Sequence, residues 1–332
     1  MGPSVKIFSG TGSHQLAEKI ANRFGAQLGR VNIQKFSDGE FQPVFLESIR
    51  GDYVFLVQST FAPTDNLMEL LLMIDAAKRA SAGKIIVIIP SYGYARQDKK
   101  EGARGPMGAK LVADLLSIAG ISGIICIELH ADSIQGFFDV PVNHINGSAI
   151  FGFNIKDIIG SNKQDYVVCS PDAGGFVRAN KFSKKLGLDG AIAINKERDK
   201  PGSISKMILM ADVTNKNIIL YDDMADSANT LCRAADYLVK EKGAKSVIAV
   251  CTHPVFSGNA IEKISTTKNL KTLFVSDTLN FDSKLLNADA VWSKAGGDSE
   301  YNSSKIQTIS CSTILAKIIG RISKGISIDS IN

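Results

Sequence analysis

The sequence predicts an α/β fold made of two similar domains, each a largely parallel sheet flanked by helices. Short runs rich in β-branched residues alternate with amphipathic stretches along the whole chain. The strand-like runs are apolar throughout, which is typical of parallel strands that helices cover on both faces. The length of 332 residues fits two domains of ordinary size.

The first half holds four predicted strands with helical patterns between them. The strands are bounded by Gly, Pro or Asp, residues that end strands, and they cover Val5–Ser9, Tyr53–Gln58, Lys84–Pro90 and Gly123–Leu129. Apolar residues recur at helical spacing in the stretches between them. We therefore expect helices over 14–25, 65–82 and 107–119.

The second half repeats this alternation. We expect further strands at Tyr166–Ser170, Ala191–Asn195, Asn217–Asp222, Ser246–Thr252, Thr272–Ser276 and Lys305–Ser310. We expect further helices over 174–187, 227–242, 257–265 and 312–323. The apolar face of the 227–242 helix is the clearest, with Leu231, Ala234, Ala235 and Leu238 at helical spacing.

Two segments interrupt the alternation. Lys196–Asp212 is polar, contains Pro201 and Gly202, and has no clear periodicity, so we expect part of it to be a mobile loop, with a short β-flap at Lys206–Met210. Pro141–Ser148 is rich in turn residues and predicts the boundary between the domains. The domains are then expected at 1–147 and 148–311.

Composition narrows the class of protein. Lys and Arg number 38 against 33 Asp and Glu, a net charge of +5 that is too small to indicate nucleic acid as a partner. The five cysteines form no CxxC pair, so neither a zinc site nor a disulfide framework is expected. The N-terminus lacks the apolar run of a signal peptide, and Ile85–Ile89 is far too short to span a membrane. We expect a cytoplasmic protein with no membrane partner.

Ligands of open parallel sheets bind beyond the carboxyl ends of the strands, so the residues that follow each strand are candidates for a site. Asp222 and Asp223 end one strand, and Asp226–Thr230 then lead into a helix. The free N–H groups at a helix N-terminus favour phosphate binding, and two carboxylates can hold the hydroxyls of a sugar or a metal on it. An ordinary Asp/Ser helix cap is the alternative interpretation.

Candidate site residues also follow three other predicted strands. Asp172 follows the 166–170 strand and is a candidate metal ligand, with a simple turn aspartate as the alternative. His130 follows the 123–129 strand, and we expect it to contact a ligand or phosphate rather than to be structural. Arg96, after the 84–90 strand, suits a nucleotide phosphate chain, although a solvated basic turn would look similar. No GxxxxGK[ST] motif is present, which argues against a Walker-type kinase.

These motifs together resemble those of the ribose-phosphate pyrophosphokinase family, over nearly the whole chain. The resemblance is carried by Phe36–Glu40 (FSDGE), Gln58–Thr60, Leu67–Leu71, Gly93–Asp98, Gln135–Asp139, Asp222–Thr230 and Thr252–Gly258. It implies two phosphoribosyltransferase-like domains, with the C-terminal helix 312–332 packing back on the first. It also implies transfer of a pyrophosphoryl group from ATP to ribose 5-phosphate, which gives phosphoribosyl pyrophosphate and AMP.

The resemblance also implies roles for single residues. Asp222, Asp223, Asp226, Ser227, Ala228, Asn229 and Thr230 would hold ribose 5-phosphate. Lys196 and Arg198 would be catalytic and would stabilise the charge of the transferring group. Arg96 and Gln97 would contact ATP, and Phe36, Asp38 and Glu40 would bind its adenine and ribose from a neighbouring subunit. Mg²⁺ would be the cofactor, held by His130 and Asp172, with Glu128 and Asp139 as further candidates. The family implies a homo-oligomer, usually a hexamer.

The sequence departs from the family pattern at several positions. Asn229 stands where Gly is usual, Glu128 where Asp is usual, Asn143 where an acidic residue is usual, and Gly108 where Ser or Thr is usual. The changes at Asn229, Glu128 and Asn143 motivate one alternative, a catalytically weak regulatory subunit of an oligomeric synthetase. A second alternative is a phosphoribosyltransferase, which would share the 222–230 motif but would not need a complete first domain with an ATP-like site.

Overall fold

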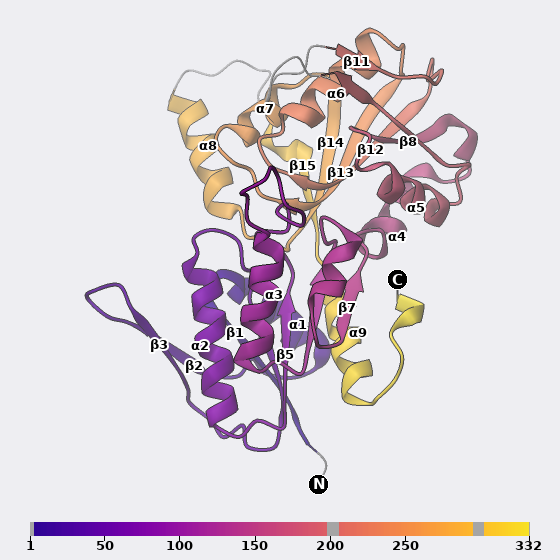
Figure 1. The fold of residues 1–332 in the computed structure, drawn as a ribbon. Helices are drawn as coiled ribbons and strands as arrows, with labels where there is room; N and C mark the ends of the chain where they lie inside the picture. Colours follow the sequence, from indigo (N-terminus) through magenta and orange to yellow (C-terminus); the bar gives the residue numbers. More distant parts are fainter. Residues whose placement is uncertain (1–2, 198–205, 295–301, 332) are drawn as a thin grey trace. The chain divides into compact units, whose positions relative to one another are not determined.

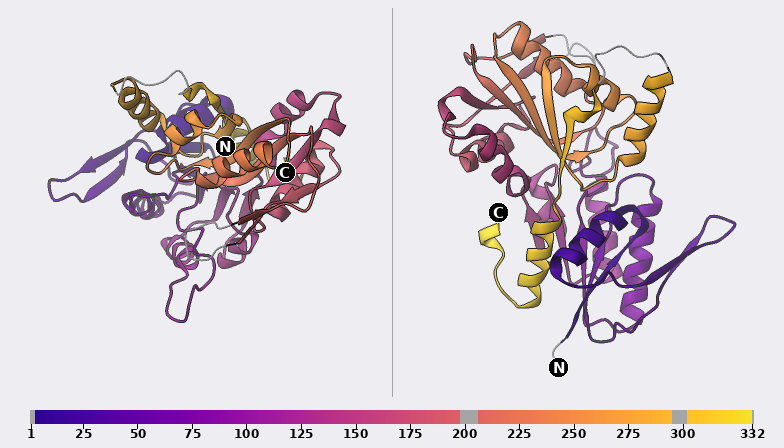
Figure 2. Two further views of the ribbon diagram at one scale, coloured as in Figure 1. Left: turned by 90° about the horizontal axis from the view of Figure 1, so that it is seen from above. Right: turned by 180° about the vertical axis from the view of Figure 1, so that it is seen from behind.

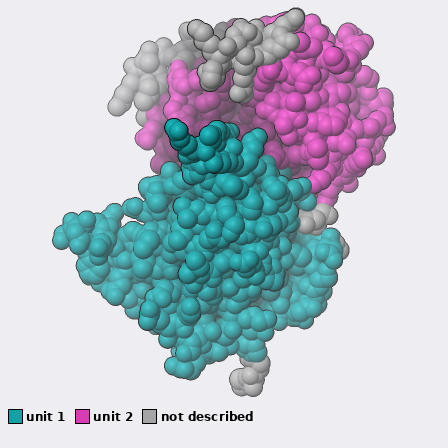
Figure 3. Space-filling model, viewed as in Figure 1, with its two compact units in different colours: residues 1–146, 278–280, 310–332 teal, residues 147–277, 281–309 magenta. Residues whose placement is uncertain are grey.

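The computed structural model describes residues 3–197, 206–294 and 302–331. The chain forms two compact units (Figure 3). Unit 1 contains residues 1–146, 278–280 and 310–332, and unit 2 contains residues 147–277 and 281–309. The C-terminal segment thus belongs to the same unit as the N-terminus.

Unit 1 is built on a five-stranded parallel sheet with the strand order β1-β4-β5-β6-β7 (Figure 1). The strands are β1 (Val5–Ser9), β4 (Tyr53–Val57), β5 (Lys84–Ile89), β6 (Gly123–Ile127) and β7 (Val142–Ile145). One face is covered by α2 (Asp65–Arg79) and α3 (Gly108–Ala119). The other is covered by α1 (His14–Phe24) and α9 (Ser312–Ser323), which pack on each other (Figures 1 and 2).

The central strands of unit 1 are buried on both faces. Val54 pairs in register with Ile85, and both belong to the apolar cluster that α2 and α3 complete. Phe55 and Ile86 are the next pair along these strands, and they are equally buried on the opposite face. Because neither face meets water, the strands have continuous apolar sequences instead of alternating ones, which is why the sequence predicts them correctly.

Unit 1 also carries an antiparallel hairpin, β2 (Val31–Lys35) and β3 (Phe41–Phe45), which extends away from the sheet (Figure 2). Neither of its strands is a continuous apolar run. Apolar and polar residues alternate in β2, and β3 is interrupted by Pro43. Such a pattern is typical of strands with one face exposed to water.

Unit 2 is built on a six-stranded parallel sheet with the order β15-β14-β13-β12-β8-β9. The strands are β8 (Tyr166–Ser170), β9 (Ala191–Ala193), β12 (Asn217–Ala225), β13 (Ser246–Pro254), β14 (Leu270–Ser276) and β15 (Ile306–Ile309). The helices are α4 (Ser148–Ile159), α5 (Phe176–Leu186), α6 (Asn229–Lys240), α7 (Ala260–Thr266) and α8 (Asp282–Lys294). A separate antiparallel pair joins β10 (Asn195–Glu197) to β11 (Lys206–Ile208).

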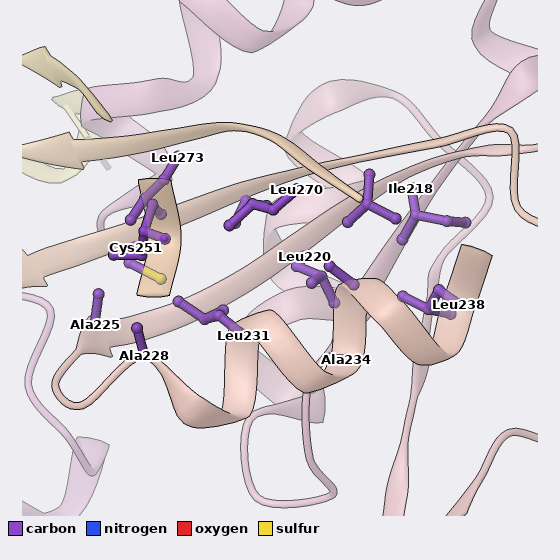
Figure 4. Packing of buried hydrophobic residues seen from close by; sticks show 14 of the residues in the cluster. Ile218, Leu220, Ala225, Ala228, Leu231, Ala234, Leu238, Cys251, Leu270 and Leu273 are labelled. Carbon is purple, nitrogen blue, oxygen red and sulfur yellow. The ribbon is translucent and has the colours of Figure 1, made fainter. Parts of the chain in front are cut away.

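The core of unit 2 forms where α6 packs on the sheet (Figure 4). Leu231, Ala234 and Leu238 point from one face of α6 toward Ile218 and Leu220 of β12. The helical spacing of these apolar residues is confirmed. The helix begins at Asn229 rather than at Ser227, however, because Ala228 has a left-handed backbone (φ 59°), which is not part of a right-handed helix.

Several elements correct the expectations from sequence. Val142–Ile145 is the edge strand β7, paired with β6, and not a turn-rich segment. Helix α4 was not expected, because its sequence is apolar around most of its circumference and therefore shows no amphipathic period. In the 196–212 segment, Lys196 and Glu197 belong to β10, and Lys206–Ile208 forms β11, which confirms the expected flap. Residues 198–205 of the expected loop lie outside the described residues. Within the described part of the chain, no helix has the length and apolar character to cross a membrane.

Candidate active site

Strand β12 extends past its expected end, so Asp222 and Asp223 lie within it. Asp226–Thr230, the 226–230 loop, contain the connection to α6 and the first two residues of that helix. The seven residues predicted to bind ribose 5-phosphate thus lie within the segment 222–230, with Met224 and Ala225 between Asp223 and Asp226. Ala228 is buried and left-handed, a conformation that is costly for any residue with a Cβ. The loop delivers the chain to the N-terminus of a twelve-residue helix, where free N–H groups and the helix dipole favour an anion.

The carboxylates of Asp222 and Asp223 lie close together. Arg178, in the first turn of α5, places its Nη1 3.6 Å from Asp222 Oδ1 and 3.3 Å from Asp223 Oδ1. The backbone N–H of Asp223 also donates a 2.9 Å hydrogen bond to Asp222 Oδ1. Burial raises the pKa of Asp222 well above its usual range, and the charges of Asp223 and Asp172 add to this effect while Arg178 opposes it.

Asp172 reaches the same edge of the sheet, because β8 lies beside β12 in parallel register. Its Oδ1 accepts a 3.0 Å hydrogen bond from the backbone N–H of Gly175. A side chain at Gly175 would not fit, since a Cβ there would lie 2.6 Å from Ser170 Oγ. The glycine therefore permits a close approach that fixes the Asp172 carboxylate.

Lys196 joins this group from strand β10. Its Nζ lies 3.6 Å from Asp172 Oδ2 and 3.5 Å from Thr230 Oγ1, and its side chain is 5% exposed. The structure therefore brings together the predicted catalytic lysine, a predicted metal ligand and the last residue of the 226–230 loop. Arg198, the second predicted catalytic residue, lies outside the described residues.

In unit 1 the predicted ATP contacts Arg96 and Gln97 are exposed in the turn after β5. The N–H of Gln97 donates to Tyr94 O (2.9 Å), and the carbonyl of Gln97 accepts the N–H of Ala109 at the start of α3 (3.2 Å). The side chain of Gln97 lies over Gly108, where a Cβ would come within 2.5 Å of Gln97 Oε1. The turn is thus held against the start of α3, and the glycine at position 108 leaves room for the side chain of Gln97.

Phe36, Asp38 and Glu40 occupy the exposed turn between β2 and β3. The turn is closed by a 2.7 Å hydrogen bond from the N–H of Phe36 to Glu40 O, and by Asp38 Oδ1, which accepts the N–H of Glu40 at 3.0 Å. Figures 1 and 2 show the hairpin extending away from the sheet and from α3. Within unit 1 the structure does not bring this turn to Arg96 and Gln97.

The remaining metal candidates of unit 1 follow β6. Glu128 is buried and left-handed (φ 40°), His130 is half-buried, and Asp139 is exposed beyond the 3-10 helix Asp132–Phe137. Asp172 belongs to unit 2. Among the described residues, no three His, Cys, Asp or Glu side chains are grouped closely enough to hold a metal by themselves.

Comparison with known proteins gives the family. One family model, the N-terminal domain of ribose phosphate pyrophosphokinase, matches residues 5–120, and the phosphoribosyl transferase domain matches residues 143–284. The ribose-phosphate pyrophosphokinase of Porphyromonas gingivalis is 50% identical over 283 residues, which cover 85% of this chain and 88% of the relative. The chain belongs to the ribose-phosphate pyrophosphokinase family.

Other similarities agree over almost the full length. The ribose-phosphate pyrophosphokinase of Vibrio cholerae is 43% identical over 330 residues and 99% of each chain. The crystal structure of phosphoribosylpyrophosphate synthetase from Mycobacterium smegmatis is 34% identical, covers 97% of this chain and 99% of its own, and has a TM-score of 0.84. These findings confirm the expected fold and family membership, and they favour neither the regulatory subunit nor the phosphoribosyltransferase.

Two features of this pyrophosphokinase site were missed from the sequence. The first is Arg178, whose contacts with Asp222 and Asp223 connect residues 44 or more positions apart. The second is a pair of backbone hydrogen bonds, from Phe256 N–H to Ala225 O (2.9 Å) and from Ser257 N–H to Asp226 O (3.1 Å). The motif around Phe256 was recognised as typical of the family, but main-chain contacts with Ala225 and Asp226 leave no signal in side-chain chemistry.

Proposed function

We propose that this chain transfers the β,γ-pyrophosphoryl group of ATP to the anomeric hydroxyl of ribose 5-phosphate, giving phosphoribosyl pyrophosphate and AMP. One observation carries the proposal. Asp222 and Asp223 stand beside the N-terminus of α6, so a carboxylate pair and an anion site occur together at one sheet edge. The chain also matches the ribose-phosphate pyrophosphokinase family over both of its halves.

Ribose 5-phosphate would bind with its phosphate at the 226–230 loop and its hydroxyls at the carboxylates. Carboxylates accept hydrogen bonds from hydroxyl groups, and N–H groups at a helix start donate to phosphate oxygens. Lys196 lies at the same edge, 3.5 Å from Thr230 Oγ1. Its ammonium would neutralise charge on the transferring group, which is the main requirement of phosphoryl-type transfer. We propose the same role for Arg198.

ATP would bind to Arg96 and Gln97 of one chain and to Phe36, Asp38 and Glu40 of a neighbouring copy. This division is supported by the hairpin, whose turn extends away from the rest of unit 1 (Figure 1). We therefore propose a homo-oligomer, by resemblance a hexamer. An exposed apolar stripe on α3 supports it, because Leu111, Leu115 and Ile118 lie on one side of that helix and are 60%, 38% and 79% exposed.

Mg²⁺ is the proposed cofactor. In phosphate-transfer sites this ion commonly takes one or two carboxylates and completes its shell with water and substrate phosphates, so a preformed cluster of protein ligands is not required. Asp172 fits this demand, with a side chain that is 42% exposed at the sheet edge. His130, Glu128 and Asp139 stay further proposals. When bound, the ion would offset the negative charge of the phosphates.

The direct test is the formation of AMP by the purified protein with ATP, Mg²⁺ and ribose 5-phosphate. We expect AMP to form only when the sugar is present, and phosphorus NMR should show the diphosphate of the product. Comparing the rate with and without added inorganic phosphate would show whether phosphate regulates the enzyme. ATP breakdown that does not depend on the sugar, or no turnover by a folded protein that binds ATP, would overturn the proposal.

All five cysteines are free thiols, which agrees with the cytoplasmic location that we propose.

A further inference from the structure

Arg178 contacts both Asp222 and Asp223. It lies in the first turn of α5, and its Nη1 is within 3.6 Å of Asp222 Oδ1 and 3.3 Å of Asp223 Oδ1. The side chain is 17% exposed, and those of Asp222 and Asp223 are 16% and 5% exposed. The three groups therefore form a largely desolvated ion-pair network at the carboxyl end of β12.

The contacts of Arg178 offset a repulsion between the neighbouring carboxylates of Asp222 and Asp223. Neighbouring residues of a strand point to opposite faces, and two carboxylates with like charge repel each other when water is excluded. Asp222 and Asp223 nevertheless each direct one oxygen to the same guanidinium. A planar guanidinium with several fixed donors can hold two carboxylates at once, which the compact ammonium of lysine does less well.

We infer that Arg178 is a positioning residue for the sugar: it holds the carboxylates of Asp222 and Asp223 in the fixed arrangement that receives the ribose hydroxyls. The inference rests on the proposed assignment of these two aspartates to the hydroxyls of ribose 5-phosphate. Arg178 acts through the aspartates and not on the substrate, because its guanidinium is directed to both carboxylates and is mostly covered.

The first experiment compares R178M and R178K with the unaltered enzyme. R178M removes the charge and should raise the KM for ribose 5-phosphate by about tenfold or more, as expected when one partner of a buried charge network is removed. The KM for ATP should stay unchanged, and kcat at saturating sugar should fall much less than the sugar KM rises. R178K should restore part of the loss, because it returns the charge without the planar geometry.

The matched control is K184M, which removes a positive charge from the exposed side of the same helix. Its two KM values and kcat should equal those of the unaltered enzyme. Thermal unfolding of each variant shows whether the fold is retained. If R178M does not fold, R178K and the double variant R178K/D223N carry the same comparison. Equal increases in the KM values for sugar and ATP would indicate general damage and would overturn the inference.

A double-mutant cycle separates the positioning role from the assignment on which it rests. D223N alone should raise the KM for ribose 5-phosphate, and adding R178M to D223N should raise it by clearly less than R178M does alone. No effect of D223N would refute the assignment of the aspartates. An effect of D223N with none of R178M, or fully additive effects, would keep the assignment but refute the positioning role of Arg178.

Discussion

Among single residues, those of the 226–230 loop have a chemistry that the sequence predicts and a backbone conformation that it does not. The chemistry of the loop is predictable, because its carboxylates and hydroxyls are visible in the sequence. The backbone conformation is not predictable. Asparagine tolerates a left-handed conformation much better than alanine does. The left-handed residue is nevertheless Ala228, and Asn229 is the first residue of α6. The tertiary contacts that hold Ala225 and Asp226 decide the conformation, and local preference does not.

The position of Asn229 leads to a prediction for the N229G variant. The side chain is exposed at the start of the helix, where its amide can donate to a bound phosphate. Losing one such hydrogen bond, worth about 1 kcal/mol, should raise the KM for ribose 5-phosphate about fivefold. The KM for ATP should not change. Steady-state kinetics with each substrate varied in turn measure both values.

A second Asn→Gly change provides the control for N229G. Asn215 is also exposed and is left-handed (φ 59°), but it precedes the amino end of β12, at the opposite end of the strand from the site. N215G should leave both KM values unaltered. If N229G also leaves the sugar KM unaltered, then Asn229 does not contact the phosphate.

At the scale of elements, the sequence predicts those strands and helices that carry a strong local pattern. Central strands such as β5 are found because they are apolar on both faces, and α6 because its apolar residues keep one helical face. The β2–β3 hairpin and α4 are missed because one is half exposed and the other is apolar nearly all round. Contacts between elements, such as Arg178 with β12, cannot be predicted because they depend on register and packing.

The contact of Gln97 with α3 leads to a prediction for G108A. A Cβ at Gly108 would lie 2.5 Å from Gln97 Oε1, which is the end of a flexible side chain and can move away. Gly108 does not have a left-handed backbone, so alanine is compatible with its conformation and restricts the unfolded chain; the thermal midpoint should not fall. The displaced Gln97 should bind ATP less well, and we expect the KM for ATP to rise about fivefold, as for the loss of one hydrogen bond.

The control for G108A is G152A, in α4. A Cβ at Gly152 meets only the side chain of Lys185, at 3.9 Å or more, so this variant makes the same helical exchange without displacing a predicted ligand contact. Its KM for ATP should equal that of the unaltered enzyme. An unchanged KM for ATP in G108A, measured at saturating ribose 5-phosphate, would show that the orientation of Gln97 over Gly108 has no role in nucleotide binding.

At the scale of the whole molecule, the two units carry different parts of the proposed reaction. Unit 2 holds the carboxylates, the 226–230 loop and Lys196, which suit the sugar phosphate, while unit 1 holds Arg96 and Gln97. The sequence predicts this division from the order of the motifs. It cannot predict which surfaces assemble, since exposed apolar residues have the same sequence pattern as buried ones. The exposed stripe Leu111, Leu115 and Ile118 on α3 is the surface that we propose for assembly.

The proposed oligomer can be tested at this stripe. Ile118 is 79% exposed, so I118E should leave the fold of a single chain unaffected, but a glutamate in an apolar interface would lose its hydration without gaining a partner. We expect a smaller particle by sedimentation velocity and a higher KM for ATP, because the neighbouring hairpin completes the proposed nucleotide site. L286E, at an exposed leucine of α8, is the control and should change neither value. If I118E sediments as the unaltered enzyme does, the stripe is not a subunit interface.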